Sequence, residues 1–192
     1  MTGTGRTAVP GRPRRADAAR NRGALLTAAR ELFDEYGPEV ALDEVARRAG
    51  VGNATLYRHF PTRGDLLVAV YAEEVTALCE QGAALLGDPS PGGALLTWLD
   101  GFVVHIATKR ALALTATEGG DERRTELFGR WHESMRSTAR GLLLRAQQAG
   151  AVRADLAVAD MLALASATAV AAADAPDARR LLRILHHGFA AT

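Results

Sequence analysis

Side chains that hydrogen-bond nucleic acids are concentrated in one short segment, residues 53–63. An arginine can bind a phosphate or the edge of a guanine, and a threonine hydroxyl can bind a base or a phosphate. Small side chains let a helix approach the base edges closely. These residue types predict a DNA-binding surface made of Asn53, Ala54, Thr55, Tyr57, Arg58, His59 and Arg63.

The members of this surface are expected to have different roles. Ala54 and Thr55 are small enough to read base edges or a thymine methyl group, whereas Tyr57 and His59 would fix the segment against backbone phosphates. Arg63 stands at the start of the following helix, whose free amides favour an anion, so we expect it to bind a phosphate. The structural alternative is that Tyr57 packs on the preceding helix and that His59 caps a helix or fills core space.

Two short helices are predicted to position this surface. The first covers residues 42–49, the turn 50–52 interrupts it with two glycines, and the second covers residues 53–60. Asn53 can cap the second helix, and Pro61 ends it because the residue before a proline disfavours helical geometry. The result is a helix-turn-helix.

The flanking segments complete the predicted N-terminal domain, residues 21–63. A helix is expected to end at Gly37-Pro38, and a longer helix follows over residues 63–81. Residues 1–20 mix glycine, proline and arginine without apolar periodicity, which predicts a mobile basic arm. Four arginines of this arm are candidates for DNA contacts: Arg6, Arg12, Arg14 and Arg15. They either reach a neighbouring minor groove or belong to a solvated tail.

Residues 46–60, with the sequence ARRAGVGNATLYRHF, closely resemble the helix-turn-helix of TetR-family regulators, and the flanking Tyr36-Gly37 and Leu66-Leu67 fit the same spacing. The resemblance implies a transcriptional regulator, by preference a repressor, that binds a pseudo-palindromic operator as a homodimer and responds to a small molecule. The chain departs from the family at Ala41 and Gly52, where a threonine and a serine are common. Each change removes a hydroxyl that can cap a helix or bind a phosphate.

The rest of the chain, residues 64–192, is expected to be a second helical domain for effector binding and dimerisation. Its predicted helices cover residues 94–107, 110–117, 121–149, 155–173 and 177–190, which makes an all-α fold of about nine helices. Up to Arg63 the chain has 11 arginines and 7 acidic residues, a net charge of +4, whereas the remainder has 12 basic and 15 acidic residues, a net charge of −3. This asymmetry favours a polyanion-binding end and a separate body.

The last two predicted helices have small and apolar surfaces that suit close helix packing. One interpretation is a two-fold four-helix dimer interface, and the other is that both helices close the core of one protomer. The candidate interface residues are Ala163, Ala167, Leu182, Leu185 and Phe189.

Aromatic and methionine side chains at helical spacing in the C-terminal domain can line an apolar cavity, although such residues also form ordinary cores. His105 and His132 are candidates for orienting a ligand there. The candidate pocket residues are Trp98, Phe102, His105, Trp131, Met135 and Met161.

Other classes of protein find less support. The single Cys79 and the lack of an apolar segment after the basic N-terminus argue against a disulfide scaffold or a secretory signal, and no stretch is long enough to span a membrane. We therefore expect a cytoplasmic protein without a cofactor. A helical-bundle enzyme is the main rival, but no HExxH motif, paired-cysteine site or glycine-rich phosphate loop occurs. An architectural DNA-binding protein without an effector is the third interpretation, and it would need no buried pocket.

Overall fold

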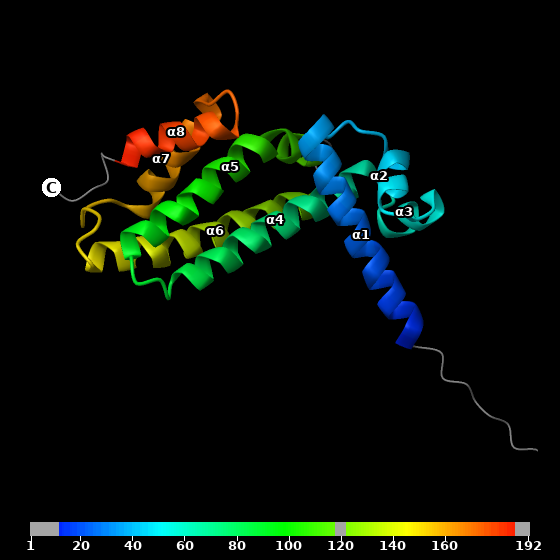
Figure 1. Ribbon diagram of the computed structural model, residues 1–192, viewed down its shortest axis with the longest axis horizontal. Helices are drawn as coiled ribbons and strands as arrows, with labels where there is room; N and C mark the ends of the chain where they lie inside the picture. Colours follow the sequence, from blue (N-terminus) through cyan, green and yellow to red (C-terminus); the bar gives the residue numbers. More distant parts are fainter. Residues whose placement is uncertain (1–11, 118–121, 187–192) are drawn as a thin grey trace, which may run out of the picture. The chain divides into compact units, whose positions relative to one another are not determined.

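The computed structural model describes residues 12–117 and 122–186, with side chains for residues 15–108 and 122–186. Within these ranges it contains eight α-helices and no strands, which confirms the all-α fold class (Figure 1). The chain divides into two compact units between Leu66 and Leu67, and a single helix, α4 (Arg63–Leu85), runs through this boundary.

The N-terminal unit contains α1 (Arg12–Tyr36), α2 (Leu42–Arg48), α3 (Asn53–His59) and the first residues of α4. Helices α2 and α3 both pack on α1. The unit closes around fully buried apolar side chains, and on α1 Leu25, Ala29 and Leu32 are spaced three or four residues apart, as expected for an amphipathic helix. The other helices contribute Val45, Ala46, Leu56 and Leu66.

Helix α1 begins at Arg12, although a mobile arm was expected up to residue 20. Pro13 is compatible with this start, because the first amides of a helix have no partner within the helix. The following residues are mostly alanine and arginine, which have high helix propensity, and Arg20 forms an ion pair with Asp17 at 3.3 Å. Of the four candidate arm arginines, Arg15 is an exposed helical residue, Arg12 and Arg14 lie in the first turn, and Arg6 lies outside the described residues.

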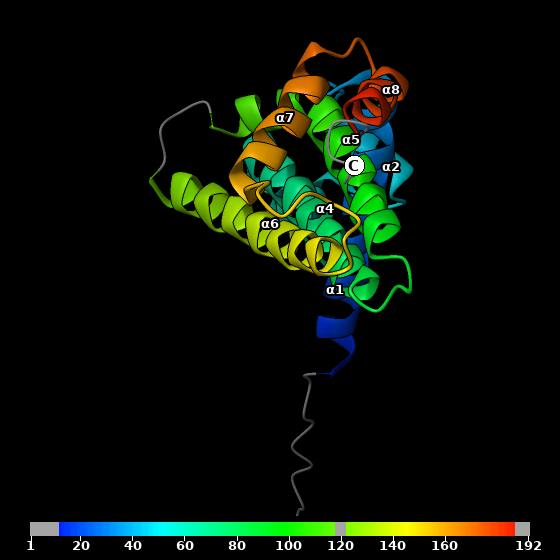
Figure 2. The ribbon, with the colours of Figure 1, turned by 90° about the vertical axis from the view of Figure 1, so that its left-hand side faces the viewer.

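The C-terminal unit contains most of α4 together with α5 (Pro91–Thr117), α6 (Glu122–Gln148), α7 (Val158–Ala171) and α8 (Ala175–His186). Helix α5 contacts α6, α7 and α8, and α7 also contacts α6 and α8, so these helices form one bundle (Figure 1 and Figure 2). The described residues have one helix fewer than expected, because the helices predicted over residues 94–107 and 110–117 form the single helix α5. No glycine or proline follows Gly101 within α5, so nothing in this stretch interrupts it.

Trp98 of α5 is at the centre of this unit. Its side chain is fully buried, stacks on Phe102 with the ring centroids 5.4 Å apart, and donates a hydrogen bond from Nε1 to the Leu78 carbonyl of α4 at 3.0 Å. Gly82 of α4 permits this approach, since a Cβ atom there would lie 2.1 Å from the Thr138 side chain and 2.9 Å from the Trp98 Nε1 atom. The tryptophan thus joins α5 to α4 through its hydrogen bond and its close approach to Gly82.

Among the described residues, none of the helices is long and apolar enough to cross a membrane.

Candidate DNA-binding surface

The turn between α2 and α3 is built on Gly50. This glycine has φ +69°, a left-handed conformation that is unfavourable for residues with a Cβ atom. The Val51 amide donates to the Ala46 carbonyl at 3.0 Å and the Gly50 amide to the Arg47 carbonyl at 3.2 Å. These bonds end α2 by satisfying carbonyls that the helix itself leaves free. The chain can then reverse within the turn and begin α3.

Gly52, not Asn53, occupies the N-cap position of α3, and no side chain caps the helix. The Gly52 carbonyl accepts the amides of Thr55 at 2.8 Å and Leu56 at 3.2 Å. The prediction that Asn53 caps this helix is therefore wrong, because Asn53 is already its first helical residue. Its exposed amide group is consequently available on the surface.

Helix α3 has one buried face and one exposed face. Leu56 is fully buried and Phe60, directly after the helix, is 3 % exposed, so both belong to the core of the unit. The Arg22 guanidinium of α1 lies 5.6 Å from the centre of the Phe60 ring and covers it from outside. The opposite face displays the predicted DNA-binding side chains: Asn53, Ala54, Tyr57 and Arg58 are exposed, and Thr55 and His59 are half-buried.

A groove of about 340 Å³ lies beside this face, between α3 and the N-terminal part of α1. Thr55, Arg58 and His59 line it from α3, and α1 contributes Asp17, Ala18 and Asn21. Sequence reasoning missed Asp17 and Ala18 because residues 1–20 were expected to be a mobile arm, whereas α1 begins at Arg12.

Arg63 has a different environment from the one predicted. Its Nη1 atom donates to the carbonyl oxygens of Pro38 at 2.6 Å and Val40 at 2.8 Å, in the loop between α1 and α2. Hydrogen bonds from a charged group to partly buried carbonyls stabilise more than neutral ones. The structure thus shows Arg63 holding a loop of the N-terminal unit, a role that competes with the predicted phosphate contact.

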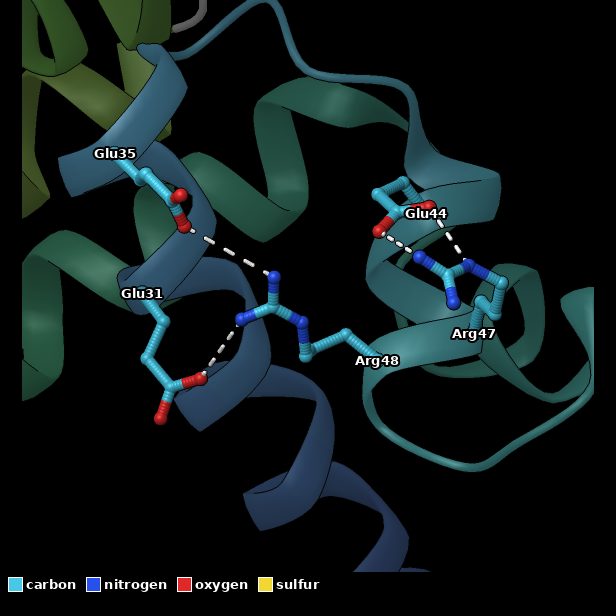
Figure 3. A network of polar contacts seen from close by, with 5 residues as sticks. All are labelled: Glu31, Glu35, Glu44, Arg47 and Arg48. Carbon is cyan, nitrogen blue, oxygen red and sulfur yellow. Dashed lines mark hydrogen bonds and ion pairs between the residues drawn. The ribbon is translucent and has the colours of Figure 1, made fainter.

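Two further arginines of the N-terminal unit form ion pairs with acidic side chains (Figure 3). Arg48 reaches from α2 to Glu31 at 3.5 Å and Glu35 at 3.9 Å, both on α1, whereas Arg47 forms a bidentate contact with Glu44 of its own helix. This hydrogen bond from Arg47 lowers the pKa of the Glu44 carboxyl. Because all these side chains are partly or largely solvated, the pairs contribute little to stability, and those of Arg48 connect α2 to α1.

Replacing Gly50 with alanine is expected to destabilise the N-terminal unit by about 1 kcal/mol, because the new residue would be held at positive φ. Gly52→Ala is the matched control. Gly52 is two residues away, has φ −75°, and has open space where a Cβ atom would be added. Chemical denaturation of both variants measures the difference. Equal stability of Gly50→Ala and Gly52→Ala would contradict this account of the turn.

The candidate effector residues of the C-terminal unit are in three different environments. Trp98 and Met161 are fully buried core residues, so the structure does not support pocket lining for them. Phe102 and Met135 line a cavity between α5, α6 and α7. The remaining two belong to a ring cluster formed with Tyr71 and Phe128, and they are His105 and Trp131.

This ring cluster is packed against itself. The Tyr71 ring lies 5.0 Å from the His105 ring, 5.0 Å from the Phe128 ring and 5.3 Å from the Trp131 ring, between ring centroids. Burial raises the pKa of Tyr71 to about 12, and the Glu74 carboxylate contributes to the rise. His105 is 7 % exposed and has its Nδ1 atom 3.8 Å from the Glu74 carboxylate. The four rings therefore pack against one another within the C-terminal unit.

The candidate dimer residues also differ in their exposure to solvent. Leu182 is 1 % exposed and belongs to the core of its own protomer, Leu185 is half-buried, and Phe189 lies outside the described residues. Ala163 and Ala167 are exposed on α7. Sequence reasoning missed three large apolar residues that the structure exposes on the same two helices: Leu164 at 43 %, Val170 at 52 % and Ile184 at 60 %.

The arrangement of an exposed recognition-type helix after a tight turn defines a helix-turn-helix DNA-binding protein. Residues 25–70 match the family described as bacterial regulatory proteins, tetR family, and residues 90–191 match the C-terminal domain described as transcriptional regulator SbtR-like. This chain belongs to the TetR family of transcriptional regulators.

Solved structures agree with this assignment along nearly the whole chain. A TetR transcriptional regulator from Streptomyces coelicolor is 32 % identical, with 89 % of this chain and 99 % of that chain covered and a TM-score of 0.75. A TetR regulatory protein from Mycobacterium vanbaalenii is 36 % identical, with 93 % and 99 % covered and a TM-score of 0.73. An HTH-type transcriptional regulator from Staphylococcus aureus is 37 % identical over 68 residues, which span 35 % of this chain and only 37 % of that relative.

Proposed function

We propose that this regulator is a homodimeric repressor that binds a pseudo-palindromic operator in the cytoplasm and is released from it by a small molecule. The observation that carries the proposal is the exposed face of α3, which Leu56 and Phe60 hold in place from the opposite side. A helix fixed in this way can enter the major groove with its side chains already oriented.

Two kinds of contact are proposed for α3. Ala54 and Thr55, near the start of the helix, read base edges, because the N-terminal residues of a recognition helix approach the bases most closely. Tyr57 and His59 contact the phosphates, and the exposed Arg58 binds a phosphate or a guanine. Base contacts would provide specificity, and phosphate contacts would fix the orientation of the helix.

Dimerisation is proposed to use the apolar surface of α7 and α8. Val170 and Ile184 are more than half exposed, and the small side chains of Ala163 and Ala167 would let a partner helix approach closely. A two-fold interface of this kind presents two copies of α3 to the two halves of a pseudo-palindrome.

Release by an effector is supported by the cavity lined by Phe102 and Met135 in the C-terminal unit. An architectural DNA-binding protein would need no such cavity. If an effector binds the DNA-incompetent state more tightly, operator affinity falls by the same factor by which the operator weakens effector binding. Helix α4 connects the two units through the chain and is the proposed path of this coupling.

The test compares variants of α3 on a bound fragment identified by genomic footprinting. Tyr57→Phe and Arg58→Ala should both weaken operator binding. If Arg58 binds a phosphate, its loss should also reduce the slope of log affinity against log salt by about 1, whereas Tyr57→Phe removes no charge and should leave the slope unchanged. Loss of a guanine contact by Arg58 would instead relax specificity at one base pair, at a cost of about 1–3 kcal/mol. Fluorescence anisotropy at matched salt measures both effects.

Arg130→Ala is the control for this experiment, because Arg130 is an exposed arginine of α6 in the C-terminal unit. Its operator affinity should equal that of the wild type. Unchanged affinity and salt dependence of both α3 variants would contradict the proposed DNA contacts.

A further inference from the structure

The cavity between α5, α6 and α7 has a volume of about 220 Å³ and an apolar floor. Phe102 is 5 % exposed and Met135 is 2 % exposed, so each offers only the part of its side chain that faces the cavity. Leu162 of α7 adds a third apolar side chain. A compact hydrocarbon or aryl group is the chemistry that such a floor retains.

The polar groups of the lining are on its other side chains. His132 and Arg136 come from α6, where a spacing of four residues places them on the same face of the helix, and Ser166 comes from α7. None of the lining residues is acidic. A ligand in this cavity therefore meets the positive charge of Arg136 and the hydroxyl of Ser166, and no carboxylate is among the lining side chains.

His132 is held in a defined tautomer. Its Nδ1 atom is 2.7 Å from the Phe128 carbonyl oxygen, and because a carbonyl can only accept, Nδ1 carries the hydrogen. The Nε2 atom of the neutral ring is then left as a hydrogen-bond acceptor.

Arg136 forms a long ion pair, with its Nε atom 3.8 Å from the Glu133 carboxylate, and its side chain is 51 % exposed. Such a pair contributes little and can be exchanged for a ligand carboxylate, which suits the planar guanidinium.

We infer that this cavity binds a small amphipathic monocarboxylate, with its apolar part on Phe102 and Met135 and its carboxylate at Arg136. The inference rests on the proposed effector response and specifies the chemical class of the effector. Arg136 selects the charge of the ligand, and the floor selects its apolar body. Because the Phe102 ring stacks on Trp98, occupation of the cavity should also change tryptophan fluorescence.

The test uses three probes with the same apolar body: 4-phenylbutyrate, 4-phenylbutan-1-ol and 4-phenylbutylamine. Calorimetric titration of the full chain should give the tightest binding for the carboxylate, about tenfold tighter than for the alcohol. Arg136→Gln should reduce this preference by about threefold to tenfold, and Arg136→Glu should shift the preference from the carboxylate to the amine. Both variants change an exposed residue of α6 and should fold normally.

Arg140→Gln is the matched control, since Arg140 is an exposed arginine one turn further along α6 that does not line the cavity. It should bind the three probes as the wild type does. Ala159→Trp places a large side chain at an exposed position of the lining and should abolish binding of all three probes.

Equal binding of the carboxylate and the alcohol, or equal effects of Arg136→Gln and Arg140→Gln, would overturn the inference. Operator binding measured without any probe distinguishes failure of this inference from failure of the proposed repressor function. If the free protein binds its operator but ignores the carboxylate, the inference fails and the repressor proposal stands. If operator binding is absent as well, the proposed function fails.

Discussion

Ile184→Arg is expected to convert a folded dimer into a folded monomer and to lower operator affinity by at least about 100-fold. Ile184 is 60 % exposed on α8, so an arginine there can place its charge in the solvent around a single protomer. Across the proposed interface, however, the same charge would be buried without a partner, which costs several kcal/mol. Light scattering, circular dichroism and operator titration measure the mass, the fold and the affinity.

Two substitutions serve as controls for Ile184→Arg. Leu144→Arg introduces the same charge at a residue of α6 that is 53 % exposed and outside the proposed interface, and it should leave the dimer intact. Leu182→Arg, at a residue that is 1 % exposed, should unfold the C-terminal unit. A folded Ile184→Arg variant that remains dimeric would refute the interface.

Trp98→Ala is expected to destabilise the C-terminal unit by about 3–5 kcal/mol, the usual cost of removing a large buried aromatic side chain. The variant loses the stacking on Phe102 and leaves the Leu78 carbonyl without its side-chain donor. For a chain of this size each kcal/mol corresponds to about 2–4 °C in Tm, so the loss should be obvious in a thermal melt.

Trp131→Ala is the comparison, because Trp131 is only half-buried at the edge of the ring cluster. It should cost clearly less than Trp98→Ala. If Trp98→Ala melts at the same temperature as Trp131→Ala, then Trp98 is not the core residue that the structure describes.

The helix-turn-helix could be predicted from the sequence because its signals are local. Gly50 ends α2 through a conformation that few other residues adopt, Pro61 stops α3, and Leu56 and Phe60 identify the buried face within a single short helix. Each of these features depends on residues a few positions apart, so the periodicity of the chain reveals them.

The environment of Arg63 could not be predicted in this way. The carbonyl groups that it binds belong to Pro38 and Val40, more than twenty residues earlier in the chain. An arginine at the start of a helix has the same sequence signature whether it binds a phosphate or the carbonyl groups of a loop. Only the tertiary structure shows that two acceptors are already within hydrogen-bond distance.

The C-terminal unit shows a similar limit. An apolar stripe on its last helix is visible in the sequence, but the stripe does not reveal whether a residue faces its own core or a partner. Leu182 was predicted at the interface and is buried in the protomer, while the neighbouring Ile184 is exposed. In the same way, Trp98 and Phe102 are aromatic residues at helical spacing on the same helix, but of these two only Phe102 lines the cavity.

The most direct test of the account is selection of DNA duplexes from a random library by the full chain. A dimer that presents two copies of α3 should enrich an inverted repeat whose half-sites are centred about 10 base pairs, or a multiple of this, apart. Substitution of Thr55 with valine, which keeps the shape but removes the hydroxyl, should alter the preferred base at symmetric positions of both half-sites. Two results would contradict recognition of DNA by α3 in a two-fold dimer. One is enrichment of no sequence, and the other is enrichment of a single asymmetric site that the Thr55→Val variant selects unchanged.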